Sequence, residues 1–133
     1  MAADQFGTLP GVASLDLASE LAAFQQQRPW PSGVRSKSLF KADDLRLLLI
    51  AMESGAKMQE HHADGTVSIH ALQGTLCVHV GKQPHVLHAG QLLTVAPGIL
   101  HDVEAREAAV WLLTLAWPGR GTMQSLPHRG YGL

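Results

Sequence analysis

The chain has 133 residues, 46% hydrophobic and 16% charged, which is the composition of one globular domain and excludes a disordered chain. Its net charge of -1 offers no bulk positive charge for nucleic acid or an anionic membrane, and no apolar run is long enough to cross a bilayer. The single cysteine, Cys77, excludes an internal disulfide and, with no signal-peptide pattern, predicts a reduced cytoplasmic location.

Residues 1–33 are expected to form an N-terminal arm followed by one short helix. Ser14 or Asp16 can cap a helix that runs to about Gln27, where the prolines of the RPWP sequence stop it. The apolar positions of this helix recur every three or four residues: Leu17, Leu21 and Phe24. The helix has one apolar stripe and no polar cluster, so we expect it to pack over a sheet or at a dimer contact.

Residues 34–117 are expected to form a β-barrel domain, because short apolar runs alternate with glycine-rich turn signals. The expected strands are Val34 to Lys41, Leu45 to Glu53, Lys57 to His62, Thr66 to Leu72, Thr75 to Val80, Pro84 to His88, Gln91 to Ala96, His101 to Ala105 and Ala109 to Trp117. The second of these runs is apolar on both faces, which predicts cover on both sides, within a sandwich or at a subunit contact. Residues 118–133, rich in glycine and proline, are expected to form an extended tail.

Two stretches combine glycines and histidines at regular spacing. In the first, Gly55 is followed by five residues and then His61, and Gly74 closes the stretch. In the second, Gly98 follows Gly90, and a histidine comes three residues later, at position 101. These patterns resemble the two motifs of the cupin superfamily, in particular small single-domain RmlC-like cupins of unknown function. The resemblance implies an all-β fold, an antiparallel double-sheet jelly roll forming a cupin barrel, with the short N-terminal helix outside it.

The resemblance also implies a candidate metal site. In metal-bearing cupins, three histidines and a glutamate hold a divalent ion inside the barrel. Here the candidate ligands are His61, His62, His101 and Glu60, whereas Val67 stands where the family has its glutamate. One candidate set is His61 with His101, and the other is Glu60, His62 and His101. Adjacent strand residues point to opposite faces, so both neighbouring histidines reach one ion only across a β-bulge. Zinc, iron, nickel and manganese are not distinguished by this pattern.

Several other positions carry expectations about the barrel interior. If Val67 faces inward, as the resemblance implies, Ile69 does too and His70 faces away. An apolar pocket lined by residues such as Met58, Val67 and Ile69 would suit a small, weakly polar ligand. Cys77 is expected to be buried as a small apolar residue. Three histidines near the Gly81 turn are expected to be solvated: His79, His85 and His88. The alternating apolar side chains of the last strand are expected to form core or a dimer contact: Trp111, Leu113, Leu115 and Trp117.

Three functional hypotheses follow. The first is a cupin that holds one divalent metal ion and binds or converts a small molecule; if it is an enzyme, a metal-dependent oxygenase or isomerase is expected. The second is a metal-free cupin that binds or senses a small ligand, with His101 as a hydrogen-bonding group. The third is a mainly structural or interaction module whose apolar strand, Leu45 to Glu53, is buried in a dimer. In each case the expected partners are a small molecule and a second copy of the chain as a homodimer, with no nucleic acid and no membrane.

Overall fold

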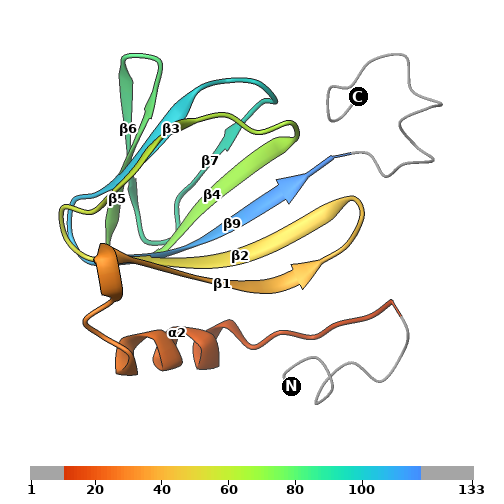
Figure 1. Cartoon of the computed structure of the whole chain (residues 1–133), viewed down its shortest axis with the longest axis vertical. Coiled ribbons are helices and arrows are strands. Elements are labelled where there is room, and N and C mark those ends of the chain that lie inside the picture. Colours follow the sequence, from red (N-terminus) through yellow and green to blue (C-terminus); the bar gives the residue numbers. More distant parts are fainter. Residues whose placement is uncertain (1–10, 118–133) are drawn as a thin grey trace.

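A computed structural model describes residues 11–117 as one helix and one 3-10 turn followed by two β-sheets (Figure 1). The helical elements are α2 (Leu17–Gln26) and η1 (Pro31–Gly33). The strands are β1 (Val34–Lys41), β2 (Leu45–Met52), β3 (Lys57–His61), β4 (Thr66–Gln73), β5 (Thr75–Val80), β6 (Gln83–His88), β7 (Leu92–Val95), β8 (His101–Ala105) and β9 (Ala109–Ala116). Each strand expected from the sequence forms, with ends that differ by one residue at most. Residues 1–10 of the expected arm and the expected tail, residues 118–133, lie outside the described residues.

The strands form two antiparallel sheets, one of five strands in the order β1-β2-β9-β4-β7 and one of four in the order β3-β8-β5-β6. The two sheets face each other and splay apart at one end, as Figure 1 shows. Inward-facing side chains alternate with outward-facing ones along each strand, and the inward set builds the main core. The largest fully buried members of this core are Met52, Ile69, Leu76, Val78, Val103 and Trp111. The expected jelly roll is therefore confirmed.

The both-face apolar character of β2 has a structural reason. Ile50 and Met52 point into the barrel, whereas Leu49 and Ala51 point outward, and all four are buried. The outward pair belongs to a second hydrophobic cluster, which joins the sheet to the helical segment: Phe24, Trp30, Leu49, Ala51 and Val110. The cover expected for this face is thus provided by the chain's own N-terminal segment, as expected for a helix that packs over a sheet.

Helix α2 begins at the second of its two candidate caps. The Asp16 carboxylate accepts hydrogen bonds from the backbone N–H of Ser19 at 3.3 Å and from its hydroxyl at 2.8 Å, and the side-chain bond is the larger cause of the lowered pKa of Asp16. Farther along, the Gln25 side-chain amide donates to that of Gln73 on β4 at 3.0 Å. No helix in the described part of the chain has the length and hydrophobicity that a membrane crossing needs.

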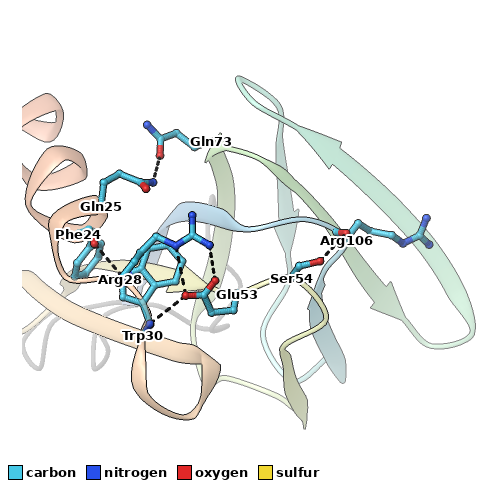
Figure 2. A network of polar contacts seen from close by, with 8 residues as sticks. All are labelled: Phe24, Gln25, Arg28, Trp30, Glu53, Ser54, Gln73 and Arg106. Carbon is cyan, nitrogen blue, oxygen red and sulfur yellow. Dashed lines mark hydrogen bonds and ion pairs between the residues drawn. The ribbon is translucent and has the colours of Figure 1, made fainter.

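A polar network fixes the segment between the helix and the sheet (Figure 2). The Arg28 guanidinium pairs with the Glu53 carboxylate just after β2, with Nη2 and Oε1 2.6 Å apart. The same carboxylate accepts the backbone N–H of Trp30 at 3.0 Å, and the Trp30 indole N–H donates to the Phe24 carbonyl at 2.9 Å. The pKa of Glu53 is lowered, first by the Arg28 side chain and next by the Trp30 N–H.

Candidate ligand-binding site

A cavity of about 980 Å³ opens between the two sheets. Its volume lies in the range of small-molecule sites, and apolar side chains from both sheets form most of its wall. The three apolar residues expected to line a pocket all do so: Met58, Val67 and Ile69. The sequence placed the apolar face of the last strand in the core or at a dimer contact. Trp111 is buried in the main core and Leu113 and Leu115 pack against it, as expected for core. The same face also lines the cavity wall: Trp111, Leu113, Leu115 and Trp117.

His61 and His101 meet in this cavity because β3 carries an irregularity. Met58 pairs with Val103 and His61 pairs with His101, so β3 advances three residues where β8 advances two. Without that extra residue, strict alternation from Met58 would turn Glu60 inward and His61 outward. The bulge restores the inward direction at His61, next to the inward-facing His101. The sequence required a bulge for His61 and His62 to reach one ion together, whereas this irregularity lies between Met58 and His61 and pairs His61 with His101.

The two imidazoles are held in one defined orientation. Their ring centroids are 4.5 Å apart, with ring planes tilted by 55°. Nδ1 of His61 lies 2.7 Å from the carbonyl oxygen of Gln59, and Nδ1 of His101 lies 3.0 Å from that of Ile99. A carbonyl oxygen can only accept, so each Nδ1 is the donor, and the neutral form of each ring keeps Nε2 as its acceptor or ligand atom. The pair therefore offers two lone pairs from adjacent side chains.

Burial separates the two members of the pair. His101 is 2% exposed, and within residues 11–117 it is the only buried residue with a polar or charged side chain. His61 is exposed and forms part of the cavity opening, as do His62 and Asp64. Glu60 is exposed and does not line the cavity. Of the two ligand sets considered from the sequence, the structure therefore brings together His61 and His101, with His62 at the opening.

The described residues do not complete the metal-ligand set that the fold family implies. Val67 is buried on the inner face, so the position that carries a glutamate in the family presents two methyl groups to the cavity. Within residues 11–117, no three His, Cys, Asp or Glu side chains lie close enough together to hold one ion. Catalytic metal sites of the histidine type commonly use three protein ligands. The pair of Nε2 atoms suits a divalent ion chemically, but it supplies only two donors.

Other titratable residues lie on the outer face of the smaller sheet. His79 was expected to be solvated, but it is half-buried and its Nδ1 lies 2.7 Å from the Asp102 carboxylate across the β5–β8 pair. Its Nε2 lies 3.7 Å from the sulfur of Cys77, which is fully buried, as expected. Lys57 is 3.8 Å from the same carboxylate. These contacts belong to the outer surface and do not reach the cavity.

Sequence reasoning gave no role to Arg46 or Asp64. Asp64 lines the cavity on the loop after β3. Arg46 lies on β2 opposite Leu115, a cavity-lining residue, and its guanidinium carbon is 5.4 Å from the centroid of the Trp117 ring. One feature of the sequence could have indicated Arg46. It is the single charged residue in the apolar run LRLLLIAM, and it lies two residues before the inward-facing Leu48, so it points to the same face of the sheet.

A profile of the cupin domain family matches residues 48–115. The chain belongs to the cupin domain family. The matched segment runs from β2 to β9 and contains the three histidines of the cavity: His61, His62 and His101. No curated protein matches the sequence closely enough to add a named relative.

Solved structures share this fold at low sequence identity. A conserved protein of unknown function from Streptococcus pyogenes is 21% identical, with 84% of this chain and 92% of that chain covered and a TM-score of 0.65. A cupin superfamily protein from Desulfitobacterium hafniense is also 21% identical, with 84% and 96% covered and a TM-score of 0.67. KdgF from Halomonas sp. is 20% identical, with 68% and 83% covered and a TM-score of 0.60. At these identities the likeness establishes the cupin fold and no activity.

Proposed function

We propose that this cupin binds a small molecule in its barrel, and that the ligand has an apolar body and a hydrogen-bond donor such as a hydroxyl group. The observation that carries this proposal is the pair of adjacent Nε2 acceptors, from His61 and His101, in the wall of an otherwise mostly apolar cavity. Neutral imidazoles with protonated Nδ1 atoms accept a hydrogen bond and do not donate one at Nε2. The apolar walls then contribute affinity by removing ligand surface from water.

A divalent metal ion on the same two nitrogens is the second candidate. The fixed ring orientation favours it, because histidine ligands commonly donate their other ring N–H to a carbonyl or carboxylate, as His61 and His101 do through Nδ1. Such an ion would act as a Lewis acid, which is the chemistry that a metal-dependent oxygenase or isomerase requires. Because Val67 occupies the glutamate position, groups other than His61 and His101 would have to supply the remaining metal ligands. We therefore place metal-free binding first.

Elemental analysis of untagged protein, together with His101→Ala, separates the two candidates. Near-stoichiometric zinc, iron, nickel or manganese that disappears in the variant would favour the second. Protein free of metal that binds hydroxylated apolar probes, followed through the fluorescence of the cavity tryptophans, would favour the first.

The matched control is His70→Gln, because His70 is half-buried on the outer face of the larger sheet, where it pairs with Leu92 and Leu112. We expect His101→Gln to weaken probe binding about tenfold, the effect of one lost hydrogen bond, and His70→Gln to leave it unchanged. Equal binding in wild type and His101→Gln would contradict the proposed site.

We also propose that the protein is a cytoplasmic homodimer. Part of the apolar outer face of β2 is covered by the protein's own helical segment, so this face offers less surface for a partner than the sequence suggested. Leu92, 53% exposed on the edge strand β7, remains an apolar contact available at that sheet. Light scattering across a concentration series tests the association: a mass of one chain at all concentrations would exclude the dimer.

A further inference from the structure

Arg46 places a charge on the inward-facing side of the barrel wall. On β2 it pairs with Leu115 of β9, in the register that also pairs Leu48 with Leu113 and Ile50 with Trp111. Residues paired across neighbouring strands point to the same face of the sheet. On β9, the residues of this face line the cavity. Arg46 is therefore a cation at the end of a row of otherwise apolar inward positions on β2.

The guanidinium of Arg46 is partly sequestered and incompletely satisfied. Its carbon atom lies 5.4 Å from the centroid of Trp117, a cavity-lining ring. Its Nε is buried and is the one buried side-chain nitrogen or oxygen in the described residues without a hydrogen-bond partner. None of the ion pairs formed within residues 11–117 involves Arg46. A buried donor on a charged group is costly when unpaired, so the position favours an anionic partner.

We propose that Arg46 binds the carboxylate of the cavity ligand, which makes that ligand a small organic acid with an apolar body. The proposal rests on the proposed function and extends it. The planar guanidinium matches a carboxylate through two parallel N–H donors. The cross-strand neighbour Lys41 adds a second, exposed cation, whereas Asp64 adds a carboxylate at the cavity opening. Arg46 is not itself a cavity-lining residue, but its guanidinium lies against Trp117, which is. One partly buried arginine beside a mostly apolar cavity suits a monoanion better than a doubly charged phosphate.

The ligand class follows from combining the two polar features of the barrel. The histidine pair accepts a hydrogen bond, from a hydroxyl for example, and Arg46 donates to an anion. The histidines lie on β3 and β8 of the smaller sheet, and Arg46 lies on β2 of the larger sheet, so the two features belong to opposite walls. An acid with a hydroxyl group remote from its carboxylate satisfies both walls while its apolar body occupies the space between them.

Matched probes test this inference on the full-length protein. Each pair consists of a hydroxylated acid with an apolar body and its primary amide, for example 3-(4-hydroxyphenyl)propanoate and 3-(4-hydroxyphenyl)propanamide. Dissociation constants are measured by tryptophan fluorescence and calorimetry for the wild type, Arg46→Gln, Arg46→Lys and Arg35→Gln. Arg35 is the matched control, because it is an exposed arginine on the adjacent strand whose cross-strand partner, Ala51, faces outward. Inorganic phosphate is tested as a competitor.

We expect the wild type to bind the acid at least about tenfold more tightly than the amide, because a hydrogen bond between two charged groups contributes more to affinity than one to a neutral amide. Arg46→Gln should abolish this preference and leave the amide affinity within about twofold, Arg46→Lys should retain part of it, and Arg35→Gln should retain all of it. Equal binding of acid and amide to the wild type, or a preference that survives Arg46→Gln, overturns the inference. Inorganic phosphate that displaces the probe as effectively as the acid also overturns the inference.

The two proposals fail in different ways. If the amide binds and depends on His101 but the acid has no advantage, the ligand-binding function stands and the role of Arg46 is refuted. If neither probe type binds the wild type, the proposed function and the inference fall together. If Arg46 instead pairs in solution with Asp64, or with a carboxylate outside residues 11–117, the acid has no advantage over the amide, and the inference is refuted.

Discussion

Replacing Trp30 by alanine is expected to lower the free energy of unfolding by about 3–5 kcal/mol, the usual cost of removing a large buried aromatic side chain. Trp30 is 3% exposed and lies in the hydrophobic cluster that attaches the helical segment to the outer face of the larger sheet. Globular domains are stable by roughly 5–15 kcal/mol, so this loss is a large share of the total.

Trp30→Phe should cost less, about 2 kcal/mol. The variant loses the indole N–H bond to the Phe24 carbonyl, worth about 1 kcal/mol, but that carbonyl keeps a second donor because Gln27 N–H lies 3.0 Å away. The smaller ring also buries roughly 40 Å² less apolar surface, worth about 1 kcal/mol. The backbone N–H of residue 30 still donates to Glu53.

Urea unfolding followed by circular dichroism measures both variants, with Val12→Ala as a control. Val12 is 57% exposed, so its truncation should change stability by less than about 0.5 kcal/mol. A loss below about 1 kcal/mol in Trp30→Ala would refute the idea that this cluster anchors the helix. Equal losses in the two Trp30 variants would show that the hydrogen bond, and not burial, dominates. Ligand affinity should stay unchanged, because the cluster lies on the face opposite the cavity.

Three further predictions concern the cavity and the packing around it. Val67→Glu should lower the free energy of unfolding by about 1–3 kcal/mol in the absence of metal, because a carboxylate enters an apolar wall. Zinc at about a hundredfold excess over its Kd should restore about 2.7 kcal/mol. A thermal shift with zinc no larger than that of the wild type would count against the inward carboxylate. The pKa of Glu53 is lowered from 4.5 by Arg28, so the stabilisation from this pair is present above pH 4.5 and is lost as the pH falls through the folded-state pKa. The stability difference between wild type and Glu53→Gln should thus be larger at neutral pH than at about pH 3, and a difference independent of pH would contradict this assignment. Gly65→Ala would place a Cβ 2.3 Å from the carbonyl oxygen of Ala116, so it should lower the free energy of unfolding in urea by about 1–3 kcal/mol. An unchanged unfolding midpoint would show that the backbone of β9 shifts at this point without loss of stability.

Much of the fold could be predicted because its signals are local. Glycine turn signals bound most of the strands. The resemblance implied an inward Val67, and alternation along β4 then correctly placed Ile69 inside and His70 outside. Both inward residues line the cavity. What local reasoning missed depends on neighbours distant in the chain: the contact of His79 with Asp102 joins β5 to β8, and the environment of Arg46 depends on β9.

The sequence by itself determined the cupin barrel, its strands and the pair of motifs that supply His61 and His101, because turn residues and side-chain alternation are encoded within a few residues. It left open which of two adjacent histidines faces the interior. Only the tertiary structure decided this point, because the extra residue in β3 is defined by its pairing with β8 and reverses the alternation after Met58. The orientation of both imidazoles is in contrast set locally, since each Nδ1 contacts the carbonyl oxygen two residues earlier, that of Gln59 in β3 and that of Ile99 before β8.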